Sequence, residues 1–296
     1  MKVLIVGATG YVGTAVDEAL SRNGHTVYGV ARSDPSRSRL LARHTNVVLA
    51  DAAKPQTLAK AAEDVDAIVY AVNVTDADPW TVDTGALKSI RKGLAGTEKT
   101  FVFVSSTWIY GATGDVPAAE TAPINPPPLL VRRIELERAT LEMTRVGIRS
   151  LIVRAGIAYG NGGGIASMFA QSARERGAAT LLGDGKNRWA MVNVADLGRF
   201  VARAVESGRP GRAYNCVNDD HYTMREIAEA ASRGAGAGGE VKILPPEIMG
   251  QFGDCLSLDQ VVDAARGKGD LGWTAEGPSV ITELEHGSYI GAALAS

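Results

Sequence analysis

Residues 1–13 read MKVLIVGATGYVG, and this stretch decides the fold class. An apolar run at residues 3–6 leads into three glycines, and the residues that follow carry apolar side chains at helical spacing. The pattern indicates a buried strand, a tight turn and the N-terminus of a helix. Backbone N–H groups and the helix dipole at such a turn can face a pyrophosphate. We expect a dinucleotide site here, with a plain chain reversal as the alternative, and its contacts are Gly7, Thr9, Gly10, Tyr11, Val12 and Gly13.

Strand and helix patterns alternate through the first two thirds of the chain. Helical patterns include residues 56–63 and 132–145. Short, apolar, β-branched runs predict further strands at residues 26–31, 47–50, 67–72, 101–104 and 151–153. This alternation predicts an α/β fold with a doubly wound parallel sheet. A ligand would bind at the carboxyl ends of the strands, near the point where the strand order reverses.

The composition of the sequence changes after residue 155, where a glycine-rich segment begins. Further on, Thr223 and Glu226 have the spacing of a capping box, which predicts a helix over residues 223–232. We therefore expect a smaller C-terminal lobe that binds the substrate. The predicted division is a dinucleotide-binding domain at residues 1–155, to which residues 190–218 return, and a substrate lobe at residues 156–189 and 219–296.

Composition excludes several classes of function. The chain has 31 basic and 33 acidic residues, so charge gives no reason to expect nucleic acid or an anionic membrane surface as a partner. Cys216 and Cys255 are the only cysteines, which suggests a reducing compartment, and the four histidines lack the spacing of metal ligands. No signal peptide and no bilayer-spanning apolar stretch is evident. The sequence predicts a cytoplasmic protein with a small-molecule substrate and no metal.

The end of the second predicted strand bears on the choice of cofactor. Sites that prefer NAD(H) usually place Asp or Glu there, ~20 residues past the glycines, to bind the ribose 2′-hydroxyl. This chain has Arg32, which cannot accept that hydrogen bond but can pair with a 2′-phosphate. We therefore expect NADP(H) rather than NAD(H), while the nearby Asp34 leaves NAD(H) as the alternative.

The third and fourth strands predict further cofactor contacts. Asp51 follows the third strand and can accept a hydrogen bond from the adenine amino group; the alternative is that it caps the next helix. The remaining contacts predicted from these strands are Ala52, Ala71, Val72 and Asn73.

Residues 101–111 read FVFVSSTWIYG, a buried strand that runs into small hydroxyl residues. In a doubly wound sheet the carboxyl end of this strand faces the nicotinamide. Ser105, Ser106 and Thr107 can therefore hydrogen-bond a substrate carbonyl or hydroxyl. The alternative is that these hydroxyls satisfy the turn after the strand.

Six segments follow one another along the chain: GATGYVG (7–13), SSTWIYG (105–111), RAGIAYGNG (154–162), VNVADLG (192–198), AYNCVND (213–219) and LGW (271–273). In this order they resemble the extended short-chain dehydrogenases/reductases of the NAD(P)-dependent epimerase/dehydratase family. The resemblance implies a Rossmann sheet and contacts of Gly156 and Ile157 with the nicotinamide. It also implies a homodimer built on the helices near residues 79–94 and 132–145.

One departure from the family pattern bears on catalysis. The family uses a Tyr-x-x-x-Lys pair, with the tyrosine as acid or base and the lysine on the ribose. Here Leu129 occupies the tyrosine position and Arg133 the lysine position. Arg133 can still bind ribose hydroxyls; alternatively it is a surface residue paired with Glu137 four residues on. The chain resembles an atypical subgroup without the pair, in which Ser106 keeps the position of the catalytic serine.

Tyr110 and Tyr159 are the nearest replacements for the missing tyrosine, although both are usually structural in this family. Arg188 lies where the family often binds a substrate phosphate, but its spacing to Asp196 differs from that of sugar epimerases by one residue, which disfavours a nucleotide sugar. The residues predicted to contact the substrate are Trp108, Tyr159, Arg188 and Trp189.

Three functions remain open at this point. The first is an oxidoreductase that prefers NADPH and acts on a small organic substrate. The second is epimerase, dehydratase or cyclase chemistry with a retained cofactor, and the third is a non-catalytic protein that senses NADP(H). We favour the first, because the whole substrate lobe is retained.

Overall fold

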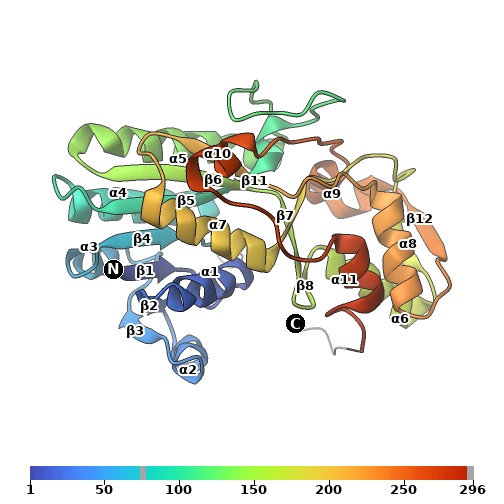
Figure 1. Cartoon of the computed structure of the whole chain (residues 1–296), viewed down its shortest axis with the longest axis horizontal. Helices are drawn as coiled ribbons and strands as arrows, with labels where there is room; N and C mark the ends of the chain where they lie inside the picture. The colour runs from blue at the N-terminus through green and yellow to red at the C-terminus, as the bar shows by residue number, and fades with distance from the viewer. Residues whose placement is uncertain (74–77, 292–296) are drawn as a thin grey trace.

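The structure is a computed structural model that describes residues 1–73 and 78–291. Seven parallel strands form the central sheet in the order β11-β6-β5-β4-β1-β2-β3, with helices on both faces and a smaller lobe at one end (Figure 1). This arrangement confirms the α/β fold with a doubly wound parallel sheet.

The strands are β1 Lys2–Val6, β2 Thr26–Ala31, β3 Asn46–Leu49, β4 Ala67–Tyr70, β5 Thr100–Ser106, β6 Arg149–Ala155, β7 Ile157–Gly160, β8 Gly163–Gly164, β9 Ala179–Leu182, β10 Met191–Asn193, β11 Ala213–Cys216 and β12 Val241–Leu244. The α-helices are α1 Tyr11–Arg22, α2 Asp34–Ala42, α3 Pro55–Glu63, α4 Pro79–Leu94, α5 Val131–Glu142, α6 Ala166–Arg176, α7 Val194–Ser207, α8 Met224–Gly234, α9 Gly250–Leu256, α10 Ala265–Leu271 and α11 Val280–His286. Short 3-10 helices are η1 Thr107–Tyr110, η2 Pro128–Leu130, η3 Met143–Val146 and η4 Pro246–Met249.

Two hydrophobic layers enclose the central sheet. On one face, residues of α1 and α7 such as Leu20 and Phe200 are fully buried against the strands. On the other face, α3, α4 and α5 contribute residues such as Leu58 and Ile90. All four residues of β4 are buried, as expected for a central strand that is covered on both sides.

The strand order reverses at β1. From this strand the chain winds outward through β2 and β3, then crosses back and continues through β4, β5 and β6. The carboxyl ends of β1 and β4 therefore lie side by side, with Val6 opposite Tyr70. Open α/β sheets bind their ligands at this kind of reversal.

The C-terminal lobe is built from α6, α8, α9 and α11 around the two-stranded sheet of β9 and β12. α7 and β11 return to the central sheet, where β11 pairs with β6. The predicted capping box of α8 is confirmed, because the Thr223 hydroxyl accepts from the Glu226 N–H and the Glu226 carboxylate accepts from the Thr223 N–H. In the part of the chain that the structure describes, no helix is long and apolar enough to cross a membrane.

The observed elements differ from the predicted ones mainly at their ends. β4 stops at Tyr70, two residues earlier than expected, whereas β5 continues to Ser106. Beyond the end of β4, β5 pairs only with β6, as in the register of Ser105 with Arg154. The carbonyl groups on the open side of β5 therefore need partners from outside the sheet.

α1 and α7 approach so closely that the contact requires glycine. A Cβ atom at Gly198 would lie 2.3 Å from the Ala15 carbonyl oxygen, which is backbone and cannot move aside. We expect Gly198→Ala to lower the free energy of unfolding by about 1–3 kcal/mol, as other overpacked cores do. Urea denaturation measures this change.

The control is Gly269→Ala in α10, because a Cβ atom there meets nothing within 4 Å. Alanine is the better helix former, so this substitution should raise the free energy of unfolding by up to about 1 kcal/mol. Equal effects of the two substitutions would contradict a close contact at Gly198.

Candidate functional site

The glycine turn after β1 is held together by backbone contacts. Gly7 has a φ angle of 93°, and a Cβ atom on it would lie 2.4 Å from the Ala71 carbonyl oxygen. A Cβ atom at Gly13 would lie 2.1 Å from the Gly7 carbonyl oxygen. α1 begins at Tyr11, and the preceding Gly10 has no side chain that could cap the helix. The first N–H groups of this helix are therefore available to an anion.

A cavity of about 510 Å³ lies against this turn, a size typical of small-molecule sites. It lies at the reversal point of the sheet, between the ends of β1, β2 and β4. Eleven of the predicted cofactor contacts line it: Gly7, Thr9, Gly10, Tyr11, Val12, Arg32, Asp51, Ala52, Ala71, Val72 and Asn73. The sequence interpretation missed Ser36 of α2 and Val82 of α4, which also line it. Both lie on helices, where no strand end marks them as contacts.

Four other predicted cofactor contacts lie outside the walls of this cavity: Gly13, Gly156, Ile157 and Arg133, whose contacts are described below. Gly13 supports the turn from behind, as described above. Gly156 packs against the chain at Ala190, whose carbonyl oxygen would lie 2.7 Å from a Cβ atom at this position. Ile157 is buried and pairs with Met191 of β10.

The residues around Arg32 differ in whether they cap a neighbouring helix. Arg32 is exposed directly after β2, and Ser33 caps α2, so Asp34 lies in the first turn of that helix. Asp51 does not cap α3, because Lys54 holds that position; the helix-cap alternative for Asp51 is wrong. Its carboxylate accepts from the Ala53 N–H at 3.0 Å.

Arg43 supports the glycine turn and was missed by the sequence interpretation. Its guanidinium donates to the Ala8 carbonyl oxygen at 2.8 Å and to the Thr14 hydroxyl at 2.6 Å. It also lies 3.5 Å from the Asp17 carboxylate. Nothing in the sequence distinguishes Arg43 from the other arginines near α2, because these partners are about 30 residues away.

The carboxyl end of β5 presents three hydroxyl groups. The Ser106 hydroxyl accepts a hydrogen bond from the Trp108 N–H at 3.2 Å, so it caps the turn and keeps its own proton for donation. Among residues 1–73 and 78–291, the Ser105 and Thr107 hydroxyl oxygens are buried without any hydrogen-bond partner. Unpartnered buried hydroxyls are costly, and their concentration here is typical of a functional site.

Arg133, at the lysine position of the family pair, points into the protein. Its guanidinium donates to the Val104 carbonyl oxygen at 2.7 Å and lies over the Phe103 ring. This bond satisfies a carbonyl of β5 beyond the end of β4. The Arg133 Nε atom is buried and has no partner in the described chain, and burial lowers the pKa of the guanidinium.

The alternative that Arg133 is a surface residue paired with Glu137 is wrong. Arg133 is partly buried, and Glu137 instead binds Arg154 of β6, with a shortest distance of 2.7 Å. Both side chains of this ion pair are almost fully buried. Leu129, at the tyrosine position, lies on η2 with 49% of its surface exposed.

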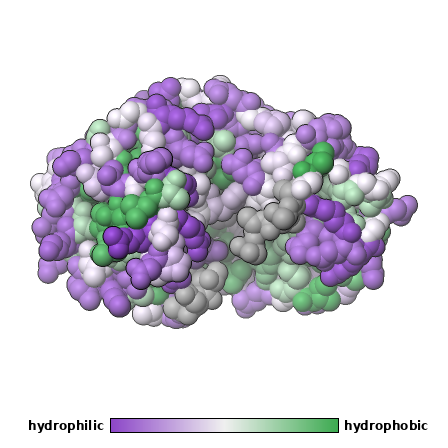
Figure 2. All heavy atoms as spheres, turned by 90° about the horizontal axis from the view of Figure 1, so that it is seen from below, coloured by the Kyte–Doolittle hydropathy of each residue, from purple (hydrophilic) through white to green (hydrophobic). Residues whose placement is uncertain are grey.

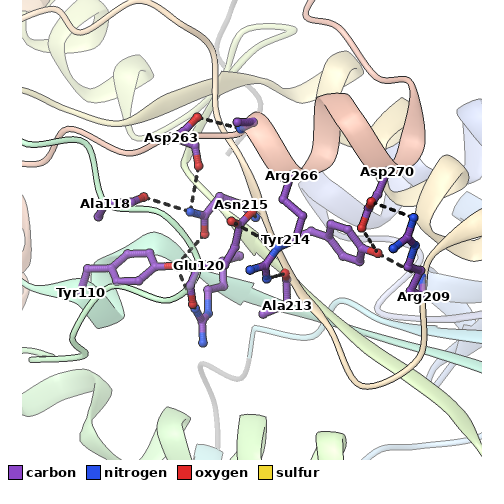
Figure 3. Close-up of polar contacts among 12 residues, drawn as sticks. Tyr110, Ala118, Glu120, Arg209, Ala213, Tyr214, Asn215, Asp263, Arg266 and Asp270 are labelled. Atoms are coloured by element: carbon purple, nitrogen blue, oxygen red, sulfur yellow. Dashed lines mark hydrogen bonds and ion pairs between the residues drawn. The ribbon is translucent and has the colours of Figure 1, made fainter.

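Tyr110 lies in a buried polar network rather than on the cavity. Its hydroxyl donates to the Asn215 side chain at 2.7 Å and accepts from Arg154 at 2.8 Å, and Figure 3 shows the ring directed toward Asn215 and Glu120. A tyrosine that acts as a base near neutral pH needs a lowered pKa, whereas burial raises the pKa of Tyr110. The geometry therefore corrects the expected catalytic role of Tyr110 to a structural one.

Asn215 connects this network to the C-terminal segment. Its side-chain amide donates to the carbonyl oxygens of Ala118 and Asp263, at 3.1 and 2.9 Å, and its N–H donates to Glu120 (Figure 3). The Tyr110 network therefore fastens the connections after β5 and α9 to the edge of the sheet.

The four residues predicted to contact the substrate have different surroundings. The Tyr159 hydroxyl is buried and donates to the Pro278 carbonyl oxygen at 2.8 Å, and burial raises its pKa, so the geometry corrects its expected role to a structural one. Arg188 bonds Asp259 at 2.6 Å and holds the pKa of that carboxylate below its usual range. Trp108 lies in η1, just after β5, where it is partly buried and packs against Phe252 of α9. Trp189 lines a second cavity, inside the lobe.

A dinucleotide fits the residues that the structure brings together. The turn at Gly7 has no room for a side chain, α1 begins without a side-chain cap, and the cavity beside them reaches Arg32. Buried polar atoms at the end of β5 and on Arg133 have no hydrogen-bond partner among the described residues. No cluster of three or more metal-ligating side chains occurs in the described ranges.

The buried ion pair between Glu137 and Arg154 gives a stability prediction. Glu137→Gln leaves the Arg154 guanidinium buried without a counter-charge, which should lower the free energy of unfolding by about 3–5 kcal/mol. Thermal and urea denaturation measure the loss. Glu18→Gln is the control, because Glu18 pairs with Arg22 on the exposed face of α1. That change should alter stability by no more than about 0.5 kcal/mol, and a similar loss in both variants would count against a special role of the buried pair.

Known proteins resemble the chain over most of its length. An uncharacterized protein of Schizosaccharomyces pombe is 24% identical over 298 residues, which cover 98% of this chain and 100% of that protein. The 2-alkyl-3-oxoalkanoate reductase of Stenotrophomonas maltophilia is 24% identical over 80% of this chain and 76% of its own length.

Among solved structures, UDP-glucose 4-epimerase from Thermus thermophilus in complex with NAD has the same fold. The TM-score is 0.81 at 21% identity, and the match covers 99% of this chain and 100% of that one. The model of the NAD dependent epimerase/dehydratase family matches residues 3–216. The chain therefore belongs to the NAD dependent epimerase/dehydratase family, whose extended short-chain dehydrogenase/reductase fold it shares.

Proposed function

We propose that the protein is an NADPH-dependent oxidoreductase that reduces the carbonyl group of a small organic substrate. The observation that carries this proposal is Arg32 on the wall of the glycine-turn cavity, with no carboxylate among the last residues of β2. A guanidinium at this point favours a 2′-phosphate over a 2′-hydroxyl. The 24% identical reductase of S. maltophilia, similar over most of this chain, supports a reductase.

The residues of the cavity have distinct roles in holding the cofactor. The N–H groups at Tyr11 and Val12, in the first turn of α1, would bind the pyrophosphate, and Asp51 would accept from the adenine amino group. Outside the walls of the cavity, Arg133 would bind ribose hydroxyls through its Nε–H group, which has no partner among the described residues. When bound, the nicotinamide supplies a hydride.

Ser106 would bind the substrate. Its hydroxyl keeps a proton for donation and lies at the carboxyl end of β5, so it can hydrogen-bond a carbonyl oxygen and stabilise the negative charge that develops there. The hydroxyl groups of Ser105 and Thr107, which have no partner among the described residues, would help to orient the same substrate carbonyl group.

No tyrosine in this proposal transfers the proton. Leu129 cannot do so, and the arginine at the lysine position remains protonated near neutral pH. The proton that completes the alcohol therefore comes from water or from the substrate itself. An epimerase that depends on a tyrosine base is disfavoured for the same reason.

Cofactor binding is the first test. Calorimetric titration of nucleotide-free protein should show that NADP and NADPH bind more tightly than NAD and NADH. Arg32→Ala should weaken binding of the phosphorylated pair by roughly tenfold or more, because a charge-assisted contact with the 2′-phosphate is lost. Binding of NAD and NADH should change little.

Arg39→Ala is the matched control, since Arg39 is an exposed arginine on α2 that does not line the cavity. Equal affinity for the phosphorylated and unphosphorylated cofactors would reject the NADP preference. Absence of binding of all four nucleotides would reject the enzyme proposal as a whole.

Turnover is the second test. With a panel of ketones, aldehydes and enones, wild-type protein should oxidise NADPH in a substrate-dependent manner. Ser106→Ala should lower kcat about 10²–10³-fold, as the loss of one donor to a developing oxyanion does. Its Kd for NADPH should remain unchanged.

Ser150→Ala is the control for the second test, because Ser150 is a buried serine at the amino end of β6 whose hydroxyl has no hydrogen-bond partner in the part of the chain that the structure describes. Product formation without net NADPH consumption would instead indicate epimerase, dehydratase or cyclase chemistry. Tight NADP(H) binding with no turnover of any substrate would indicate a cofactor-sensing protein.

A further inference from the structure

A second cavity of about 320 Å³ lies inside the C-terminal lobe, away from the glycine turn. α6, β9, β12 and η4 provide most of its walls, together with the residues that begin α8 and end α9. The side chains that line it include Phe169, Leu182, Trp189, Leu244 and Met249. The walls are therefore mainly hydrocarbon and aromatic.

The only polar group of the Trp189 side chain already has a hydrogen-bond partner within the protein. Its indole N–H donates to the Leu256 carbonyl oxygen at 2.9 Å, and its ring packs against Phe169 with the ring centres 5.7 Å apart. The indole is thus fixed by one hydrogen bond and one ring contact. It offers a ligand an apolar surface of fixed orientation.

The polar side chains on the walls are largely occupied. Gln171 donates to Glu175 at 2.8 Å, and the Ser172 hydroxyl donates to the Phe169 carbonyl oxygen and accepts from the Thr180 N–H. The Thr180 hydroxyl oxygen is buried and has no partner in the ranges that the structure describes. The wall therefore offers one unpartnered buried hydroxyl to a ligand.

Arg188, the residue predicted to bind a substrate phosphate, lies outside the walls of this cavity. Arg188 precedes Trp189 but does not line the cavity, and its guanidinium binds the carboxylates of Asp259 and Asp115 at 2.6 and 2.9 Å. A diphosphate would have to break these ion pairs. Arg176 and Glu175, at the solvent-exposed end of α6, contribute opposite charges that favour no anion.

The mouth of the cavity is apolar and adaptable. Met168 and Ile248 line it with 42% and 56% of their surfaces exposed, and hydrophobic residues are visible on the lobe among mostly hydrophilic ones (Figure 2). Methionine side chains adapt to ligands of different shape. Large exposed apolar side chains around an opening are typical of a binding site for an apolar group.

A continuous apolar core joins this cavity to the end of β5. Trp108, two residues after Ser106, packs edge-on against Phe252 of α9 with the ring centres 5.9 Å apart. Both rings, like Met249, pack against the buried hydrophobic cluster that contains Trp189. The same apolar cluster therefore contributes to the walls of the lobe cavity and packs against the residues that follow the proposed catalytic hydroxyl.

We infer that the lobe cavity binds a hydrocarbon chain of the substrate and thereby selects apolar carbonyl compounds rather than nucleotide sugars. This inference rests on the proposed reductase function for its identification of the ligand as substrate. Thr180 would bind one polar group of the ligand, and the remaining walls would exclude water from the chain.

Binding of 2-alkanones with four to ten carbons tests the inference without relying on turnover. Affinity, measured by tryptophan fluorescence and calorimetry on the full protein, should rise roughly fourfold per added methylene until the cavity is filled, which corresponds to about 0.8 kcal/mol per CH₂. In a turnover assay with NADPH, KM should fall with chain length in parallel.

Ile248→Glu should weaken binding of 2-octanone at least tenfold, because it places a carboxylate at the apolar mouth. The matched control is Ile243→Glu, since Ile243 is also 56% exposed but does not line the cavity. Ile243→Glu should bind 2-octanone like the wild type, and both variants should keep the wild-type Kd for NADPH.

The two proposals fail in distinguishable ways. Chain-length-dependent binding that Ile248→Glu abolishes, without NADPH oxidation, would support the apolar site and reject the reductase function. Absence of 2-alkanone binding, affinity independent of chain length, equal effects of the two glutamate variants, or tighter binding of UDP-glucose than of 2-octanone would each overturn the apolar site.

Discussion

The close approach of three backbone segments at Gly7 is the constraint on which the rest of the site depends. The carbonyl oxygens of Gly7 and Ala71 lie where Cβ atoms would have to be placed, so no side chain fits at Gly7 or Gly13. This contact joins the end of β1, the end of β4 and the start of α1. It sets the cavity at the reversal of the strand order and aims the first N–H groups of α1 at it.

Local features of the sequence predict the fold and most of the walls of the glycine-turn cavity. The glycine turn, the residues that end β2 and β4, and the capping box of α8 all depend on contacts within a few residues along the chain. Ser36, Val82 and Arg43 could not be predicted in the same way. Their positions depend on how α2 and α4 pack against the sheet, and a periodic pattern does not give that packing.

The surroundings of the carboxyl end of β5 show the limit of reasoning from spacing alone. The i to i+4 spacing pairs Arg133 with Glu137, yet both side chains find stronger partners on the sheet: the Val104 carbonyl oxygen and Arg154. Because β4 ends early, β5 exposes a carbonyl that Arg133 satisfies. Likewise Tyr110, next to the hydroxyl residues in sequence, turns into the network of Asn215, which is about 100 residues away.

The missing tyrosine and the apolar lobe have one common physical consequence. In the proposed reductase, which has no tyrosine to transfer a proton, only hydrogen-bond donors would act on the substrate carbonyl, and donors act most strongly where water is excluded. An apolar cavity that takes up the hydrocarbon of a substrate can anchor it without charged groups. The burial of each methylene adds to the free energy of binding without any ion pair. Arg188 is paired with Asp259 and Asp115, which is consistent with a lobe that does not bind a substrate phosphate. Trp189, which does line the cavity, likewise offers a ligand no polar group, because its indole N–H donates to the Leu256 carbonyl oxygen.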